Sequence, residues 1–154
     1  MKKTGILTLY YENYNFGGLL QAYALPKVLK DKFGMDSEQI SYSLYVEEKS
    51  ENMHIQSNSP VYKMGIYFFS KINEKKINVR KRVFEKFMEE IPHSEEIYDY
   101  QSIRECLNSY QIFICGGDQI WNACNGIQNL NVFTLNFVPE DVKKIAYAPS
   151  MAIL

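Results

Sequence analysis

Residues 110–122 read YQIFICGGDQIWN, an aromatic and β-branched run that ends at two glycines. Such a run is typical of a buried strand, and Gly116 and Gly117 directly after it predict a turn. Residues 5–18, GILTLYYENYNFGG, have a similar order near the N-terminus: a short apolar run, a polar stretch and a second glycine pair. The sequence therefore predicts two buried strands, each followed by a glycine-containing turn.

A helix is expected after the first glycine pair. Apolar residues recur there at three- and four-residue spacing as far as Gly34, in two sets: Leu20, Ala24 and Val28, and Leu25, Leu29 and Phe33. Pro26 lies inside this pattern, where it lacks an N–H group, so a kink or a division of the helix is predicted. Residues 37–44, SEQISYSL, then read as a strand, which completes a βαβ unit.

The rest of the chain continues the alternation. Residues 47–60 are polar and unpatterned and predict a loop, residues 61–91 favour helix, and a short helix is expected at about 101–108. A last strand is predicted from Val142 to Ala148. Strands that alternate with helices favour an α/β fold, a Rossmann-like open parallel sheet, whose ligands bind at the carboxyl ends of the strands.

Composition narrows the function classes. The chain has 154 residues, 17 Lys and Arg against 18 Asp and Glu, and 46% hydrophobic residues. This size and balance fit one folded domain without the basic excess that non-specific nucleic-acid binding requires. The longest uncharged run, 119–139, carries several Asn and Gln, so no transmembrane segment is predicted. Polar residues also interrupt the apolar N-terminal stretch, which favours a cytoplasmic protein without a signal peptide.

The sequence gives little support for a metal site or for a catalytic triad. The three cysteines, Cys106, Cys115 and Cys124, have no close metal-type spacing and form an odd number, so neither zinc nor a disulfide is favoured. His54 and His93 lack a neighbouring Ser or Cys nucleophile, and both are expected at the surface. No metal site is predicted.

The first glycine turn is one candidate binding site. Glycine lets the backbone approach a ligand, and a helix start offers free N–H groups to an anion or a sugar oxygen. Only two adjacent glycines occur, so this is not the GxGxxG dinucleotide motif. The alternative is a tight strand-to-helix turn capped by polar side chains. The residues concerned are Asn13, Asn15, Gly17, Gly18 and Gln21.

The second glycine turn carries a denser polar cluster, which suits a polyhydroxylated ligand. Asp118 has the chemistry to accept a proton from a sugar hydroxyl, and Trp121 either stacks on a sugar or braces the loop. The alternative is a turn closed by Asp118 beside a core tryptophan. The cluster is Gly116, Gly117, Asp118, Gln119, Trp121 and Asn122.

One basic stretch interrupts the balanced charge. Residues 71–86 hold an excess of Lys and Arg over Glu. Such a stretch suits contact with anionic lipid at the membrane surface or with a phosphorylated glycan carrier. A solvated helix face is the alternative interpretation.

Three segments together resemble the polysaccharide pyruvyl transferase family: GILTLYYENYNFGGLLQAYAL at 5–25, FICGGDQIWN at 113–122 and KKIAYAPSMA at 143–152. Their order matches the N-terminal half of that family. The sequence departs from the family pattern at Pro26, at Gly117 in place of a more usual Ser, and at Pro149-Ser150-Met151 in place of an Ala-Ser-aromatic ending.

The resemblance implies a fold and an activity. Members have two Rossmann-like lobes arranged as in glycosyltransferase-B enzymes and transfer pyruvate from phosphoenolpyruvate to saccharide hydroxyls as a ketal. Residues 1–154 then correspond to a single N-terminal lobe, with the C-terminal lobe absent. The chain is then a fragment, a truncated gene product, or one member of a split enzyme whose partner is a complementary C-terminal lobe. The acceptor is a saccharide or a lipid-linked glycan of exopolysaccharide or cell-wall synthesis, which places the protein in the cytoplasm at the inner face of the membrane. Phosphoenolpyruvate is the donor substrate, and no cofactor is expected.

The same resemblance suggests roles for the two turns. Asp118 is the candidate general base, and the saccharide is expected to contact Asn15, Gly17, Gly18, Gln21, Gly116, Gly117, Gln119, Trp121, Asn122 and Ser150. The three arginines, Arg80, Arg82 and Arg104, lie outside both turns, so a clamp for the anionic donor is expected in the second lobe and little activity in this lobe alone. A non-catalytic module that binds carbohydrate or protein, or a truncated remnant, remains the alternative.

Overall fold

The computed structural model describes residues 3–44, 79 and 81–151. These residues belong to two compact units, one made of Met1–Tyr45 with Glu89–Leu154 and the other of Val46–Met88. In the second unit the described residues 81–88 are helical, and Lys81 and Glu85 form an ion pair one turn apart. The expected loop at 47–60 and most of the basic stretch at 71–86 lie outside the described residues.

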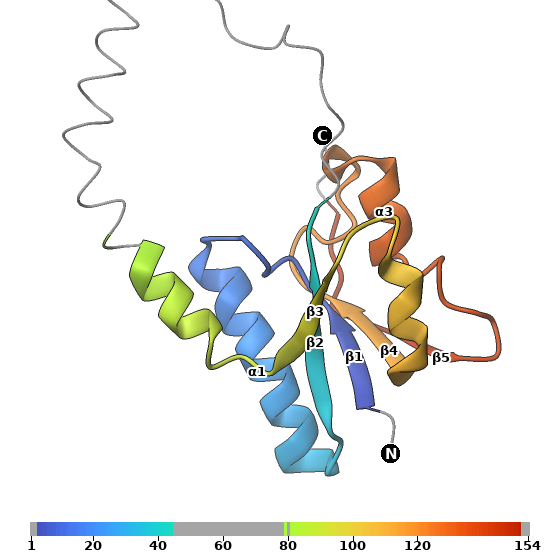
Figure 1. Ribbon diagram of the computed structural model, residues 1–154, viewed down its shortest axis with the longest axis horizontal. Helices are drawn as coiled ribbons and strands as arrows, with labels where there is room; N and C mark the ends of the chain where they lie inside the picture. The colour runs from blue at the N-terminus through green and yellow to red at the C-terminus, as the bar shows by residue number, and fades with distance from the viewer. Residues whose placement is uncertain (1–2, 45–78, 80, 152–154) are drawn as a thin grey trace, which may run out of the picture. The chain divides into compact units, whose positions relative to one another are not determined.

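The first unit contains a five-stranded sheet in which every pair of neighbouring strands is parallel (Figure 1). The strand order is β3-β2-β1-β4-β5, so the chain starts in the middle of the sheet and builds outward on both sides. This architecture confirms the predicted Rossmann-like open sheet. The strands are β1 Lys3–Leu7, β2 Ser37–Tyr42, β3 His93–Tyr98, β4 Tyr110–Gly116 and β5 Lys143–Tyr147.

Helix α1, Phe16–Phe33, connects β1 to β2 and confirms the predicted βαβ unit. The Asn15 side chain caps its first turn, and Gly34 ends it in a left-handed conformation with φ of 63°. Both caps follow the usual preferences, since Asn accepts from a free N–H and Gly tolerates positive φ. Pro26 lies inside this helix without dividing it.

The buried face of α1 excludes the first predicted set and includes only part of the second, because Phe33 is exposed. Leu25 and Leu29 are buried, whereas Leu20, Val28 and Phe33 are 57%, 48% and 68% exposed. The buried stripe includes Leu19 and Ala22 instead. Because apolar residues occur on both sides of this helix, spacing alone could not select the side that packs on the sheet.

Alternate residues of the central strands support two separate hydrophobic clusters, one on each face of the sheet. Ile6 and Ile114 pack with Leu25 and Leu29 of α1. Their neighbours Leu7, Phe113 and Cys115 belong to the larger cluster on the other face. That face is covered by η2, Ile103–Asn108, and α3, Ile127–Phe133, as Figure 1 shows. Burial on both faces explains the nearly continuous apolar character of β1 and β4.

Several predicted elements differ in detail, and other elements, among them the short 3₁₀ helix η3 at Ala123–Asn125, were not predicted. The helix expected at 101–108 is the 3₁₀ helix η2, and the strand expected at Val142 to Ala148 is the slightly shorter β5. Helix α3, which falls in the amide-rich run 119–139, has only 7 residues, too few for its apolar spacing to be recognised. Strand β3 was also missed; it begins at His93, which is exposed as expected.

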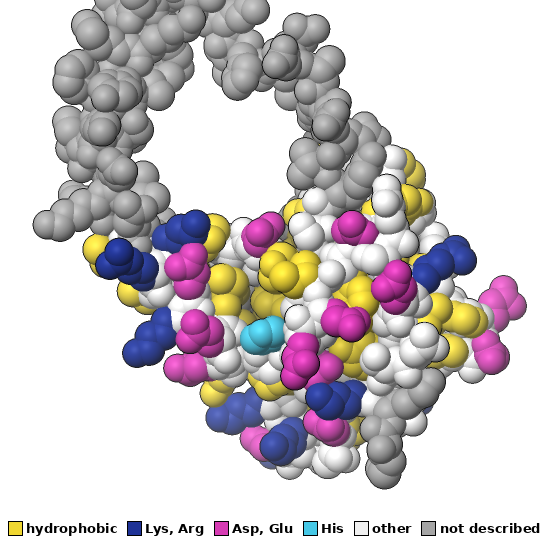
Figure 2. Space-filling view, in the orientation of Figure 1, with side chains coloured by type: hydrophobic (Ala, Val, Ile, Leu, Met, Phe, Trp, Pro, Cys, Tyr) yellow, Lys and Arg dark blue, Asp and Glu magenta, His cyan; other side chains and the backbone are white. Residues whose placement is uncertain are grey.

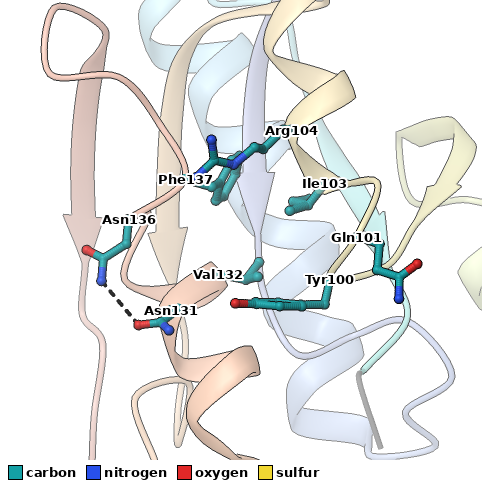
Figure 3. Close-up of a pocket in the computed structure, with 8 residues that line it drawn as sticks. All are labelled: Tyr100, Gln101, Ile103, Arg104, Asn131, Val132, Asn136 and Phe137. Carbon is teal, nitrogen blue, oxygen red and sulfur yellow. Dashed lines mark hydrogen bonds between the residues drawn. The ribbon is translucent and has the colours of Figure 1, made fainter.

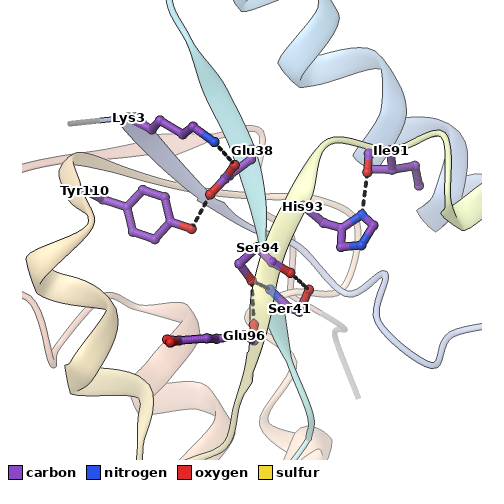
Figure 4. A network of polar contacts seen from close by, with 8 residues as sticks. All are labelled: Lys3, Glu38, Ser41, Ile91, His93, Ser94, Glu96 and Tyr110. Atoms are coloured by element: carbon purple, nitrogen blue, oxygen red, sulfur yellow. Dashed lines mark hydrogen bonds and ion pairs between the residues drawn. The ribbon is translucent and has the colours of Figure 1, made fainter. Parts of the chain in front are cut away.

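An irregular pairing explains why β3 escaped prediction. Gln39 of β2 pairs with His93 of β3, but Ser41, two residues further along β2, pairs with Ile97, four residues further along β3. The Ser94 hydroxyl fills the resulting gap in the backbone ladder: it accepts from the Ser41 N–H at 2.9 Å and donates to the Glu96 carbonyl at 2.7 Å (Figure 4). A bulged strand of this kind loses the simple two-residue period.

Polar and charged side chains at the amino ends of three strands are linked by hydrogen bonds. Glu38 of β2 accepts from the Lys3 ammonium of β1 and from the Tyr110 hydroxyl of β4 (Figure 4). On the face shown in Figure 2, acidic and basic side chains are interspersed, without a broad patch of one sign. None of the described helices is both long and apolar enough for a membrane span.

Candidate functional site

The two glycine turns meet at the carboxyl edge of the sheet. Leu7, the last residue of β1, lies beside Cys115 of β4, so the segments that follow these strands leave the sheet together. They enclose a pocket of about 290 Å³. It is lined from the β1–α1 segment by Thr8, Leu9, Asn13, Asn15, Gly17, Gly18 and Gln21, and from the segment after β4 by Gly117, Asp118 and Gln119.

Two asparagine side chains hold the β1–α1 segment in shape through hydrogen bonds to its backbone. The Asn15 side chain accepts from the Gly17 N–H at 2.8 Å, and the Asn13 side-chain amide donates to the Leu9 carbonyl at 2.8 Å. A Cβ atom on Gly18 would come within 3.0 Å of that same carbonyl, so a small residue is needed there. Both the capped-turn and the binding-site interpretations of this segment therefore have support, because the turn is capped and it also lines a pocket.

Glycine is required at each of the two positions at the end of β4 for a different steric reason. A Cβ atom on Gly116 would lie 2.4 Å from the Tyr147 carbonyl of β5, which no flexible side chain can relieve. Gly117 has φ of 132°, a conformation that other residues rarely adopt. Gln119 also has a positive φ, 61°. The loop is thus sharply bent, and the bend directs Asp118 and Gln119 into the pocket.

Ser150 holds the Asp118 carboxylate. Its hydroxyl donates to Asp118 Oδ1 at 2.7 Å and accepts from the Gln119 backbone N–H at 2.8 Å. The Gln119 side-chain amide donates to the same Oδ1 atom over a longer 3.4 Å. In the described part of the chain, Asp118 Oδ2 has no hydrogen bond, so one oxygen is fixed and the other is available to a ligand.

Further amide contacts join the two sides of the pocket and shape the loop. Gln21 Oε1, on α1, accepts from the Asp118 N–H at 3.4 Å. Asn122 donates to Gln119 Oε1 at 3.1 Å, which orients the amide that faces Asp118, and its own Oδ1 caps η3, Ala123–Asn125. Asn125 donates to the Gln119 carbonyl at 3.2 Å.

Trp121 points away from the pocket. Its indole N–H donates to the Phe133 carbonyl at 3.0 Å, and its ring packs against the core cluster under α3. The backbone N–H of Trp121 also donates to the Ser150 carbonyl at 3.1 Å. These contacts favour the loop-bracing role over stacking on a sugar. Gly116, Asn122 and Ser150 likewise shape the loop without lining the pocket.

Thr8 and Leu9 are lining residues that the sequence analysis did not single out. Thr8 is only 5% exposed, and its hydroxyl donates to Gln39 Oε1 at 3.0 Å. Their position directly after β1 was the available signal, because side chains at a strand's carboxyl end face such a pocket.

The chemistry of the pocket is polar and without a cation. Its lining provides one carboxylate, several carboxamides and a hydroxyl, but no Lys or Arg. Among the described residues there is no cluster of three or more His, Cys, Asp or Glu side chains that could hold a metal ion. Such a lining can hydrogen-bond several hydroxyl groups and accept one proton.

The parallel sheet, with a pocket at the carboxyl ends of its strands, defines a Rossmann-like domain. The sequence model of the polysaccharide pyruvyl transferase family matches residues 15–153, nearly the whole chain, so the protein belongs to this family. Searches among curated proteins and among solved structures gave no significant match.

Proposed function

We propose that this domain is the acceptor-side lobe of an enzyme that transfers pyruvate from phosphoenolpyruvate to saccharide hydroxyls as a ketal. The observation that carries the proposal is the Asp118 carboxylate, which has one oxygen fixed by Ser150 and the other open in a pocket lined by carboxamides. Family membership supports a saccharide acceptor. The acceptor is a saccharide or a lipid-linked glycan presented at the inner face of the membrane.

The reaction requires two hydroxyl groups of one sugar and one molecule of phosphoenolpyruvate. The methylene carbon of the donor takes a proton and becomes the methyl group, and the neighbouring carbon gains cationic character. The two sugar oxygens bond to that carbon, the bond to the phosphate oxygen breaks, and phosphate leaves. One hydroxyl proton balances the proton on the methyl group, and the other leaves with phosphate or a base.

Asp118 is the base that accepts a hydroxyl proton in this proposal. A carboxylate within hydrogen-bond reach of the attacking hydroxyl serves this role, and general-base catalysis contributes about 10²–10⁴-fold in rate. Ser150 keeps the carboxylate in place through Oδ1, which leaves Oδ2 for the sugar. Gln21, Gln119 and the backbone at Gly18 hydrogen-bond the remaining hydroxyls. Gly17 lets the sugar approach the backbone, and Asn15 preserves the turn by accepting from the Gly17 N–H.

The donor needs groups that this pocket does not provide. Phosphoenolpyruvate carries a carboxylate and a phosphate, and such anions are bound by Arg or Lys. No Lys or Arg lines the pocket. We therefore assign donor binding to a second, complementary lobe and expect little turnover by this lobe alone, because unpositioned reactants lose several kcal/mol of catalysis.

The test combines the chain with a C-terminal lobe from a two-lobe member of the family, phosphoenolpyruvate and a glycan acceptor. Phosphate release and ketal formation are followed with and without the added lobe. Asp118→Asn is expected to lower both by about 10²–10⁴-fold. Asp141→Asn, which changes an exposed aspartate outside the pocket, is the matched control. Turnover that is unaffected by Asp118→Asn would remove the base assignment.

The cation-free lining also supports a second candidate, a non-catalytic carbohydrate-binding module. Saccharide binding at the pocket without phosphate release, even after the second lobe is added, would favour this module. A stable complex between the two lobes with ketal formation would favour the enzyme.

A further inference from the structure

A second pocket lies on the face of the sheet covered by η2 and α3. Its volume is about 420 Å³, within the range of small-molecule sites, and it shares no residue with the pocket at Asp118. The side chains come from the segment that begins η2 and from the C-terminal part of α3 with the turn after it (Figure 3). Neither glycine turn contributes to it.

The floor of this pocket is apolar and belongs to the hydrophobic core. Ile103, Val132 and Phe137 line it, and each is at least nine-tenths buried as part of the hydrophobic core. Tyr100, 39% exposed, adds an aromatic wall at one end (Figure 3). An aromatic ring beside an apolar floor suits the C–H faces of a sugar ring, which are the apolar part of a carbohydrate.

The rim provides oriented hydrogen-bonding groups. Asn136 Nδ2 donates to Asn131 Oδ1 at 3.3 Å, as Figure 3 shows. This contact uses one donor of Asn136 and the oxygen of Asn131, which leaves the Asn131 amide donors and the Asn136 oxygen for other partners. Paired donors and acceptors at a rim are suited to the hydroxyl groups of a sugar.

Arg104 supplies the charge. It lies at the opposite end of the pocket from the Tyr100 ring (Figure 3). Within the described ranges its guanidinium has no hydrogen bond or ion pair, although Arg is able to bind a carboxylate through two parallel N–H groups. An unpaired guanidinium beside a carboxamide rim favours an acidic sugar over a neutral one.

From these features we propose that the pocket between η2 and α3 binds a sugar unit that carries a carboxylate. Arg104 holds the carboxylate, Asn131 and Asn136 bind hydroxyl groups, and the sugar ring rests on the apolar floor beside Tyr100. The proposal does not depend on pyruvyl transfer at Asp118, since it concerns binding at a separate pocket.

The test is an NMR titration of the ¹⁵N-labelled full chain with sodium glucuronate, in which the side-chain amide signals of Asn131 and Asn136 are followed. A ligand of about 13 non-hydrogen atoms at a drug-like efficiency binds with a dissociation constant of about 1 mM. We expect saturable shifts of these signals in that range and at least about tenfold weaker binding of glucose, which lacks the charge. Absence of saturable shifts up to about 50 mM overturns the proposal.

Two variants test whether the glucuronate carboxylate binds at Arg104. Arg104→Gln keeps hydrogen-bond donors but removes the cation, and Asn131→Asp keeps the shape and the contact from Asn136 but adds a like charge. Each is expected to weaken glucuronate binding by about tenfold or more while leaving the dispersed spectrum of the folded chain intact. Lys143→Gln removes one exposed positive charge elsewhere on the same unit and is expected to have no effect.

Equal weakening by Lys143→Gln and Arg104→Gln would show a general charge effect and overturn the site. Equal binding of glucose and glucuronate would overturn the role of Arg104. Shifts confined to the Asn15 and Gln119 amides would place the ligand in the other pocket and also overturn it. No phosphoenolpyruvate is present, so these results stand apart from the outcome at Asp118.

Discussion

The side-chain amide of Gln39 donates to the main-chain carbonyl of Ala22 at 2.9 Å. In an α-helix the Ala22 carbonyl would accept from the N–H four residues later, but that position is Pro26, which has none. A fully buried side chain of β2 therefore replaces the missing backbone donor of α1. The other end of the same amide, Oε1, accepts from Thr8, which lines the pocket. One residue thus stabilises the helix and positions the end of β1.

We expect Gln39→Leu to destabilise the domain. The substitution leaves the Ala22 carbonyl and the Thr8 hydroxyl buried without these partners, and an unsatisfied buried polar group costs about 1–3 kcal/mol. Urea unfolding followed by circular dichroism measures the loss. Thr8→Val, which removes only the second contact, is expected to cost less than Gln39→Leu.

Pro26→Ala tests directly whether the Gln39 side chain replaces the missing backbone donor. It restores a backbone N–H to the Ala22 carbonyl, so Gln39→Leu is expected to cost less in this background than in the natural one. A coupling energy of about 0.5 kcal/mol or more in the double-mutant cycle supports the assignment. Strictly additive effects of the two substitutions would show that Gln39 does not substitute for the missing N–H.

This contact also shows where sequence reasoning about the fold reached its limit. The alternation of strands and helices predicted the parallel sheet, and Gly34 marked the end of α1. Pro26 correctly signalled a lost hydrogen bond, but its replacement comes from a strand that only the folded chain brings near. Likewise, the apolar residues on both sides of α1 left its buried side undecided, and the bulge at Ser94 removed the period by which β3 could be found.

At the candidate site, the sequence predicted where the two turns lie more successfully than what each side chain does. Two glycine turns after parallel strands indicated one shared edge, and the structure brings Gly17 and Asp118 into one pocket. The direction of individual side chains was not available from residue type. Trp121 turns inward because its indole N–H finds the Phe133 carbonyl, and Ser150 reaches Asp118 across 32 positions of sequence.

Alanine substitutions at Gly116 and Gly17 test whether β4 and β5 approach too closely for a side chain at Gly116. Gly116→Ala places a Cβ against the Tyr147 carbonyl, so it is expected to cost about 1–3 kcal/mol through overpacking between β4 and β5. Gly17→Ala meets nothing closer than Asn15 Oδ1 at 3.4 Å, and alanine favours helix by about 0.5–1 kcal/mol. Thermal unfolding compares the two variants. Equal stability of Gly116→Ala and the natural chain would contradict the close β4–β5 approach.

The three cysteines are expected to differ in reactivity toward a thiol reagent. Cys124 is exposed, whereas burial raises the pKa of the Cys115 thiol and raises that of Cys106 to about 12. Because the thiolate is the reactive form, Cys106 is ionised in only about one molecule in ten thousand at about pH 8. Mass spectrometry after brief alkylation of the native chain should find modification at Cys124, and at the other two only after denaturation. Rapid labelling of Cys106 in the native chain would contradict its burial.

Alkaline pH is expected to destabilise the domain. Burial raises the pKa of Cys106 from 9.0 to about 12 and that of Tyr10 from 10.0 to about 12. Between these values the unfolded chain releases protons that the folded chain retains, so the free energy of unfolding falls as pH rises from about 9 to about 12. Urea unfolding at about pH 8 and about pH 10.5 measures the fall. Cys106→Ala should reduce it, and an equally steep fall in that variant would exclude Cys106 as a source.

Ser150→Ala separates the positioning of Asp118 from its presence. The hydroxyl is both the donor to Asp118 Oδ1 and the acceptor for the Gln119 N–H, so its loss frees the carboxylate and loosens a loop residue with positive φ. A positioning role predicts that Ser150→Ala lowers the turnover of the complemented enzyme by about tenfold, less than Asp118→Asn, because a misplaced base retains part of its effect. Ser150→Thr keeps the hydroxyl and is expected to recover much of the rate. If Ser150→Ala and Asp118→Asn together lower the rate by the product of their separate effects, the serine does not act through the carboxylate, and the arrangement at Oδ1 has no part in the reaction.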